Sequence, residues 1–260
     1  MKINILTDNV AGEGFDAEHG LSYLIEIDGE NILFDTGHSD IFLKNATKLG
    51  KDIQHDVKKV VLSHGHWDHG GGLVHLQHKT LLTHPGSFVK RYRKRDHSYI
   101  GLRFTKEETA QRFQLTTSTT SVQLTPNLWF LGQIPRLNDF EAQSTAFLLD
   151  QDIEDFIDDD SALVATTGSE LVVISGCAHS GICNICEYAK KISGISTIKA
   201  VIGGFHLKDA GEQTQKTADY FAENKVEQLL PAHCTQPEAK AYFHKRFQFS
   251  DVKTGMVFEF

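Results

Sequence analysis

The chain carries Ser63-His64-Gly65-His66-Trp67-Asp68-His69-Gly70-Gly71-Gly72 directly after an apolar run that ends at Leu62. Three imidazoles and one carboxylate therefore lie within a few residues of one another. Zinc and similar divalent ions take nitrogen and oxygen donors of this kind, and catalytic sites keep one coordination position open. The alternative is a polar surface turn that gathers histidines by chance in a chain with 14 of them. The spacing favours a metal site with four candidate ligands, which are His64, His66, Asp68 and His69.

Length and composition predict an ordinary globular chain. With 260 residues, 40% hydrophobic and 23% charged, we expect one domain over 1–260, with an insertion or lid at about 84–141, where the pattern is least regular. No run approaches the roughly 20 apolar residues of a membrane span. The first residues enter a strand pattern without a signal-peptide core, so we expect a cytoplasmic protein without a membrane partner.

Charge narrows the class of partner. The net charge of −8 argues against a nucleic-acid binder, whose surface is normally positive. A basic run covers Lys90 to Arg95 and an acidic run covers Asp155 to Asp160. We expect both runs to be solvated faces or loops, although either could border a pocket for a charged substrate.

The four cysteines do not form a disulfide framework in a chain of this length, so we expect reduced thiols. The pair Cys183 and Cys186 has the spacing of a redox or zinc motif. Because the pair lies in a predicted helix without a second such motif, two buried small hydrophobic residues are the favoured interpretation.

The first half of the chain is rich in predicted strands. They cover Lys2 to Leu6, Leu21 to Ile27, Asn31 to Phe34 and Lys58 to Leu62. Asp28-Gly29 predicts a tight hairpin turn between the second and third. A helix is expected over Ser39 to Leu49, capped by Ser39 and ended by Gly50. Further strands are predicted near Leu128 to Leu131, Thr145 to Leu149, Leu163 to Ala165 and Leu171 to Ile174.

The last third alternates strands and helices. The strands are Leu171 to Ile174, Lys199 to Ile202 and Glu227 to Leu230, and the helices are Ile182 to Ile192, Gln213 to Asn224 and Pro237 to Phe247. A histidine follows each strand: His179, His206 and His233. Reactive groups gather at the carboxyl ends of strands in αβ sheets, because the loops there converge. We therefore expect these histidines to join the first cluster as metal ligands, although each alone could be an ordinary loop residue.

Two further residues are expected to support the ligands. Asp35 ends an early strand, and its carboxylate could accept a hydrogen bond from the free N–H of a metal-bound imidazole. Cys177 lies two residues before His179 at another strand end.

Taken together, these motifs resemble the metallo-β-lactamase superfamily. The match rests on Ser63 to Gly72, on Phe34-Asp35-Thr36-Gly37 upstream and on the strand-end histidines downstream. The resemblance implies an α/β (α+β) fold, a four-layered αββα sandwich of two mixed sheets flanked by helices. It also implies one or two divalent ions at a sheet edge, zinc first, with manganese or iron as alternatives.

A narrower resemblance is to the subfamily of dihydropterin–ribofuranosylaminobenzene 5′-phosphate synthase. It rests on Gly176 to Ile182, Gly203 to Leu207, Pro231 to Thr235 and Gly132 to Arg136. The wider superfamily has a bridging aspartate at a strand end where this chain has Gly203-Gly204-Phe205-His206. The second metal site is therefore expected to be weak, differently built or occupied by another ion.

The resemblance implies His64, His66 and His179 around one metal, and Asp68, His69 and either His233 or His206 around a second. A divalent ion lowers the pKa of bound water from about 15.7 toward 7 and polarises a carbonyl or phosphoryl oxygen. Asp68 is the candidate catalytic residue, since it could take a proton when it is not fully engaged as a ligand.

The candidate substrate-binding residues lie in the expected insertion. They are Arg136, whose guanidinium could meet a phosphate or carboxylate or else pair with Glu141, and His84. Aromatic residues such as Phe88, Tyr92, Tyr99 and Phe104 could stack on a planar ring or pack a small subdomain. We expect a small-molecule substrate, anionic or phosphorylated.

Three functions stay open. The first is a metal-dependent hydrolase acting on an ester, lactone or phosphoester, the second a synthase-like condensing enzyme, and the third a non-catalytic metal-binding or redox protein. Hydrolase is the leading prediction.

Overall fold

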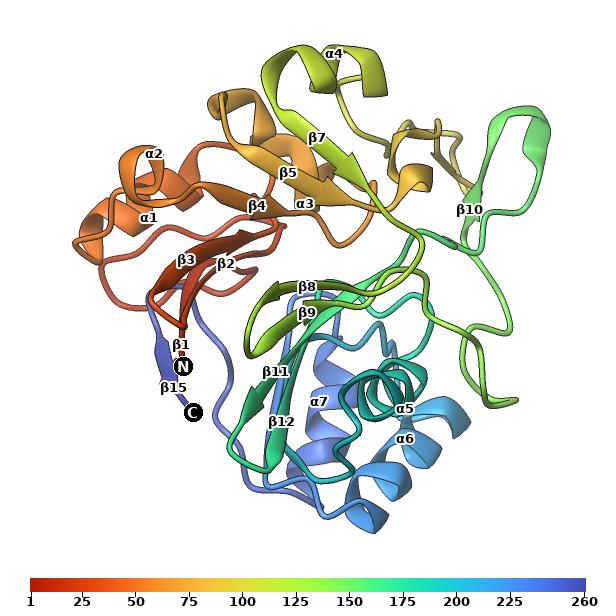
Figure 1. Ribbon diagram of the computed structural model, residues 1–260. Helices are drawn as coiled ribbons and strands as arrows, with labels where there is room; N and C mark the ends of the chain where they lie inside the picture. The colour runs from red at the N-terminus through yellow and green to blue at the C-terminus, as the bar shows by residue number, and fades with distance from the viewer.

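The fold is known from a computed structural model that describes residues 1–260, and it is built on two large sheets (Figure 1). The first contains β1 (Lys2–Thr7), β2 (Ser22–Ile27), β3 (Glu30–Phe34), β4 (Lys59–Val61), β5 (Thr80–Thr83), β7 (Gln114–Thr117) and β15 (Val257–Glu259). The second contains β8 (Val122–Thr125), β9 (Leu128–Phe130), β11 (Ala162–Thr167), β12 (Glu170–Ser175), β13 (Ile198–Gly204) and β14 (Gln228–Ala232). The strand orders are β15-β1-β2-β3-β4-β5-β7 and β14-β13-β12-β11-β9-β8.

Seven α-helices accompany the sheets. They are α1 (Ile41–Lys48), α2 (Ile53–Asp56), α3 (Trp67–Gly70), α4 (Lys106–Arg112), α5 (Ile182–Ser193), α6 (Glu212–Glu223) and α7 (Pro237–His244). Short 3₁₀ turns cover Gly71–His75, Pro85–Phe88 and Asp150–Asp152. None of these helices combines the length and the apolar character that crossing a bilayer requires.

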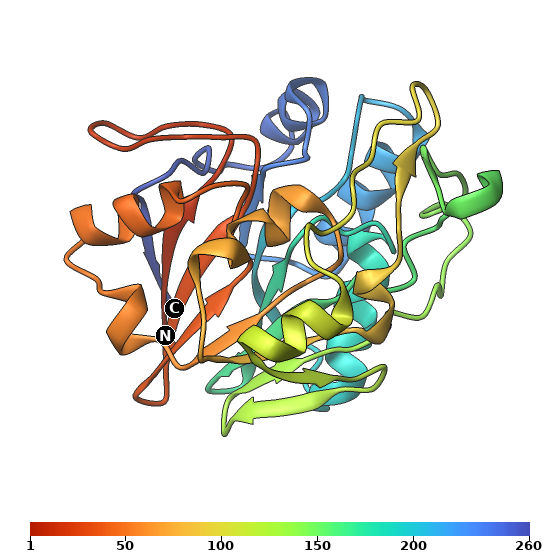
Figure 2. The same cartoon turned by 90° about the horizontal axis from the view of Figure 1, so that it is seen from above.

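Three apolar cores divide the molecule into four layers. The central core lies between the sheets and takes Ile25 from β2 and Val172 from β12. A second core joins the outer face of the second sheet to α5, α6 and α7. A third joins the first sheet to α1, α2 and the turn after α3, and Figure 2 shows these helices over the strands of that sheet. The four-layered αββα sandwich is confirmed.

This layering arises because the side chains along each strand point alternately to the two faces of the sheet. In β11, Leu163 and Ala165 face the central core, whereas Ala162 and Val164 face the helices. Successive side chains of a strand point to opposite faces, so a sheet that is covered on both sides reads as a continuous apolar run.

Several predicted boundaries need correction. The first helix begins at Ile41 rather than Ser39; the Ser39 hydroxyl still accepts a hydrogen bond from Ile41 N at 3.3 Å, but Ser39 precedes the cap position. The last helix ends at His244. The strand predicted over Thr145 to Leu149 is short: β10 (Phe147–Leu148) pairs only with β6 (Tyr92–Arg93) in a two-stranded ribbon.

The insertion predicted at about 84–141 is wrong in its extent. Residues 114–130 supply β7 to the first sheet and β8 and β9 to the second. The patterns of β7 and β8 are short and polar because each of these two strands lies at the edge of its sheet and is only partly buried. What remains of a lid is the β6–β10 ribbon with its flanking loops.

The two charged runs are not simply solvated faces, because they meet each other. Arg91 is buried, and its guanidinium pairs with Asp155 at 2.7 Å and with Asp159. Asp159 also accepts a hydrogen bond from Gly65 N at 2.8 Å. The ribbon is thereby tied to the loop that carries His64.

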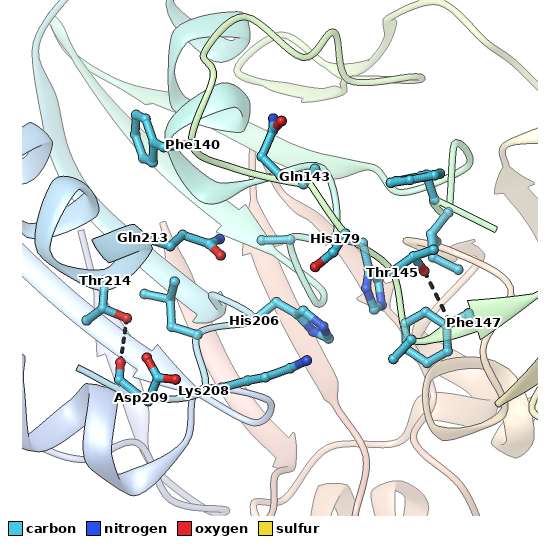
Figure 3. Close-up of a pocket in the computed structure, with 17 residues that line it drawn as sticks. Phe140, Gln143, Thr145, Phe147, His179, His206, Lys208, Asp209, Gln213 and Thr214 are labelled. Carbon is cyan, nitrogen blue, oxygen red and sulfur yellow. Dashed lines mark hydrogen bonds between the residues drawn. The ribbon is translucent and has the colours of Figure 1, made fainter. Parts of the chain in front are cut away.

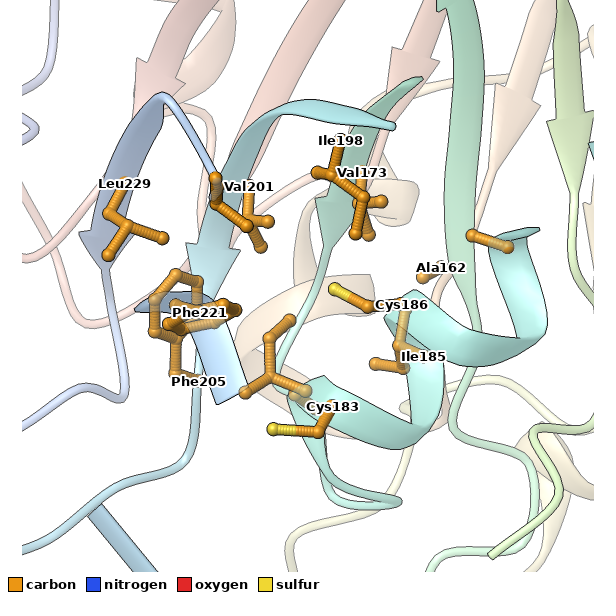
Figure 4. Close-up of a cluster of buried hydrophobic side chains, with 14 of the residues drawn as sticks. Ala162, Val173, Cys183, Ile185, Cys186, Ile198, Val201, Phe205, Phe221 and Leu229 are labelled. Atoms are coloured by element: carbon orange, nitrogen blue, oxygen red, sulfur yellow. The ribbon is translucent and has the colours of Figure 1, made fainter. Parts of the chain in front are cut away.

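Cys183 and Cys186 belong to the helix-side core of the second sheet (Figure 4). Both are buried on α5 and neither forms a disulfide. Their interpretation as small hydrophobic residues is confirmed.

Candidate metal centre

The predicted ligands converge where the two sheets deliver the carboxyl ends of their parallel strands. In the first sheet β3 runs parallel to β4, and in the second sheet β13 runs parallel to both β12 and β14. His64 follows β4, and His179, His206 and His233 follow β12, β13 and β14. The rule that strand ends converge therefore brings together residues from both ends of the chain.

A first donor group combines His64, His66 and His179, whose ligand atoms all lie within 4.8 Å of one another. His64 Nε2 lies 2.9 Å from His66 Nδ1. Ser63 Oγ lies 2.9 Å from His64 Nδ1 and can accept its proton, which leaves Nε2 free for the centre.

The first donor group fits a cation. All three imidazoles are buried, and His66 Nε2 and His179 Nε2 have no hydrogen-bond partner. An unpaired buried polar atom costs stability unless a ligand satisfies it, and two imidazole nitrogens at 2.9 Å need a proton or a cation between them. Burial, the largest cause, lowers the pKa of each of the three well below the ordinary value of histidine. The neutral, metal-binding form is therefore favoured.

A second donor group lies around Asp68. Its Oδ2 lies 3.5 Å from His233 Nε2 and 3.0 Å from His19 Nε2, and His233 Nε2 lies 3.1 Å from His69 Nε2. Burial acts to raise the pKa of Asp68, but hydrogen bonds from His19 and His233 outweigh burial and hold that pKa well below the usual value. Asp68 is therefore an anionic donor at neutral pH.

Asp35 lies behind His69, in the supporting position predicted for it. The Asp35 carboxylate accepts hydrogen bonds from His69 Nδ1, from Ser63 N and from Ser63 Oγ, each at 2.7 Å. Burial lowers the pKa of His69, but the charge and hydrogen bond of Asp35 raise it overall to about 9. The Nδ1 proton is fixed toward Asp35, so Nε2 faces the centre.

His206 belongs to a third group and not to the one around Asp68. Its ligand atom lies within 4.8 Å of Cys177 Sγ and Cys234 Sγ, and its ring centroid lies 4.3 Å from that of His179. Of the two alternatives for the second site, the structure thus places His233 and not His206 beside Asp68. Cys177 Sγ lies close to more than one of these groups, because it also comes within 4.8 Å of donor atoms of His64 and His69.

Four residues at the strand ends have left-handed backbone conformations, which orient the side chains of the site. Asp35, Ala178, His206 and His233 have φ of 57°, 55°, 50° and 46°. Non-glycine residues in this region cost roughly 1 kcal/mol or more each and concentrate at functional sites. The sheet geometry holds all four in place.

A cavity of about 200 Å³ opens beside His179 and His206 (Figure 3). Phe140, Phe147 and Phe156 supply aromatic walls, and Lys208 supplies a cation. The exposed Lys208 ammonium takes part in no ion pair. Phe147, from the ribbon, also packs 4.9 Å from the His66 ring, so the cavity adjoins the first donor group.

The two predicted substrate-binding residues, Arg136 and His84, do not line this cavity, so their role in substrate binding stays a prediction. Arg136 donates to Asp158 Oδ1 at 2.8 Å and to Phe156 O at 2.6 Å. His84 is buried, and its Nδ1 accepts from Gly86 N at 3.0 Å in a local turn.

The predicted pairing of Arg136 with Glu141 is wrong, because Arg136 pairs with Asp158. Glu141 is buried and accepts hydrogen bonds from Cys183 N and Asn184 N, each at 2.9 Å, at the start of α5. A carboxylate there satisfies backbone amides that have no partner within the helix.

Sequence reasoning missed three residues of the site. His19 lies in the loop between β1 and β2, and Asn9 in that loop contacts His233 Nδ1 at 3.0 Å through its Oδ1. Lys208 lies two residues after His206, and this proximity to a strand-end histidine was the only available signal. His19 and Asn9 have no motif spacing, because a loop conformation brings them to the site.

Comparisons with known proteins show the family of the chain. The family profile described as metallo-beta-lactamase superfamily matches residues 16–190. MJ0448, an uncharacterized protein of Methanocaldococcus jannaschii, is 34% identical over 241 residues, covering 90% of each chain. The same organism's 7,8-dihydropterin-6-methyl-4-(beta-D-ribofuranosyl)-aminobenzene-5'-phosphate synthase is 30% identical over 286 residues, covering 100% of this chain and 97% of the synthase.

Among solved structures, Tm1679 is described as a metal-dependent hydrolase of the beta-lactamase superfamily. It superposes with a TM-score of 0.87 at 33% identity, covering 100% of this chain and 99% of the other. The profile spans most of the chain, and the two relatives span nearly all of it. The chain therefore belongs to the metallo-beta-lactamase superfamily.

Proposed function

We propose that this protein is a metal-dependent hydrolase that acts on a small ester, lactone or phosphoester carrying an anionic group. The observation that carries the proposal is the first donor group, whose buried nitrogens without partners adjoin a cavity with an unpaired lysine. His64, His66 and His179 would hold one divalent ion, and Asp68, His69 and His233 a second. Zinc is the first choice because the donors are imidazole and carboxylate, with manganese or iron as alternatives.

When bound, a divalent ion supplies Lewis acidity and a nucleophile at neutral pH. The remaining tasks fall to the chain. Asp35 and Ser63 orient His69 and His64 through the hydrogen bonds described above. Asp68 Oδ1 takes part in no hydrogen bond, so we assign it the role of accepting a proton from the attacking water. Lys208 would bind the anionic group, and Phe147 would exclude solvent from the reacting bond.

A second candidate is a condensation like that of the synthase relative. The aromatic walls of the cavity favour it, since Phe140, Phe147 and Phe156 suit a planar ring. A third is a non-catalytic metal-binding or redox protein, for which the thiols of Cys177 and Cys234 beside His206 are the supporting feature.

One experiment separates these functions. Purified protein is analysed for metal and assayed against a panel of phosphoesters, lactones and pterin–arylamine pairs, with His66→Ala beside it. Zinc or manganese with hydrolysis that is lost in His66→Ala supports the hydrolase. Formation of a pterin–arylamine adduct without hydrolysis favours the synthase. Iron with a redox-active absorption band and no turnover overturns both catalytic proposals.

A further inference from the structure

His19 stands in the second donor group although no strand-end motif contains it. Its Nε2 lies 3.0 Å from Asp68 Oδ2, and His233 Nε2 approaches the same oxygen at 3.5 Å. The donor atoms of His19, Asp68 and His233 all lie within 4.8 Å of one another. This is the separation expected of ligands that share one ion.

The surroundings of His19 fix its position. Its ring lies between Trp67 and His233, with centroid distances of 5.7 and 5.2 Å. Asn9 Nδ2 lies 3.4 Å from His19 Nδ1 and donates to His233 O at 3.1 Å. The side chain is thus oriented although it is 53% exposed.

The backbone beside His19 is anchored as well. Leu21 N donates to Asp68 O at 3.2 Å. A Cβ on Gly20 would lie 2.8 Å from Asp68 O, so only glycine allows the loop to approach this closely. The loop is therefore built against the residue that His19 contacts.

The second group also lacks one donor. The strand end of β13 carries His206, which lies with Cys177 and Cys234 and not with Asp68. Without another side chain, Asp68, His69 and His233 supply only three donors. The Nε2 atom of His19 is the further side-chain nitrogen that lies beside Asp68.

We propose that His19 is a fourth protein ligand of the second metal ion and supplies the donor that β13 does not. The inference rests on the proposed function, because it presumes that the Asp68 group binds a metal. A two-metal centre in this chain would then depend on the β1–β2 loop as well as on the strand ends.

Cobalt binding to the metal-free full-length protein tests the proposal. Co²⁺ is titrated into wild type, His19→Ala and His19→Gln, with absorption spectra and NMR of the shifted, exchangeable imidazole N–H protons. We expect two equivalents in the wild type. In both variants the first equivalent binds unchanged, the second binds at least about tenfold more weakly, and one shifted N–H signal disappears. Glutamine keeps a donor toward Asp68, so its failure separates ligation from hydrogen bonding.

His38→Ala is the matched control. The His38 ring packs 4.5 Å from the same Trp67 but belongs to no donor group, so both equivalents should bind as in the wild type. Unchanged thermal unfolding of the metal-free variants would show that the fold is intact. Full second-site affinity with every shifted signal retained in His19→Ala would overturn the proposal, as would a wild type that binds one equivalent only. A wild type that binds no metal would contradict the proposed function itself.

Discussion

Replacing Asp35 with asparagine tests how a buried carboxylate controls the protonation of His69. Asp35 is fully buried and accepts three hydrogen bonds, one of them from His69 Nδ1. The substitution keeps one oxygen for Ser63 N but removes the negative charge. With that charge gone, burial becomes the dominant influence, and the pKa of His69 should fall from about 9 to below its ordinary 6.5.

The raised pKa of His69 makes the free energy of unfolding depend on pH. A change from 6.5 to about 9 corresponds to about 3 kcal/mol of favourable interaction in the folded state. Because the folded pKa is the higher one, this stabilisation is complete below pH 6.5 and is lost as pH rises through about 9. Asp35→Asn should therefore be less stable than wild type at pH 6, and the difference should shrink by about 3 kcal/mol by pH 9.5.

Urea denaturation of the metal-free proteins between pH 6 and 9.5 measures this difference directly, and imidazole NMR follows the pKa of His69. Asp158→Asn is the control, because Asp158 is an exposed partner of Arg136, and its curve should run parallel to that of wild type. A constant offset between Asp35→Asn and wild type across the whole range would refute the assignment. So would a His69 midpoint that stays near 9 in the variant.

Three further outcomes are expected. His66→Ala should abolish turnover while circular dichroism and thermal unfolding stay close to wild type, and unchanged turnover in a metal-analysed sample would contradict the site. Lys208→Gln should raise KM for anionic substrates about tenfold, about 1.4 kcal/mol, and leave neutral substrates unaffected; the same effect from Arg136→Gln instead would move the anion site. Arg91→Met should lower the free energy of unfolding by about 3–5 kcal/mol, because it leaves two buried carboxylates without a positive charge beside them. A urea-measured loss below about 1 kcal/mol would mean that these ion pairs are effectively solvated.

The convergence of the strand-end histidines follows from local patterns and one topological rule, whereas the four layers are implied by the resemblance to the metallo-β-lactamase superfamily. Short β-branched, apolar runs mark the strands, and parallel strands deliver their carboxyl ends to one edge of the sheet. Asp35 was predicted to support an imidazole on the same basis. None of this requires knowledge of a distant contact.

Other features of the structure depend on contacts between residues that are far apart in the sequence, so the sequence did not predict them. The burial of Arg91 follows from Asp155 and Asp159, which lie more than sixty residues away, and a basic run alone resembles a solvated face. From the sequence, Arg136 could bind a substrate anion or pair with Glu141, whereas in the structure it pairs with Asp158. His19 reaches Asp68 through a loop conformation that no periodicity encodes.

The pairing of β1 with β15 sets an order of events during synthesis. Lys2 to Asn4 pair with Val257 to Glu259, and the amino group of Met1 donates to Phe260 O at 2.9 Å. At translation rates of about 5–20 residues per second, β1 emerges tens of seconds before this partner exists. Until then β1 is an open sheet edge, which invites pairing with other chains. The pairing therefore replaces the six-residue β1 by the three-residue β15 at the edge of the sheet that carries His64, so removing Val257 to Glu259 would leave the longer strand β1 as an unpaired edge.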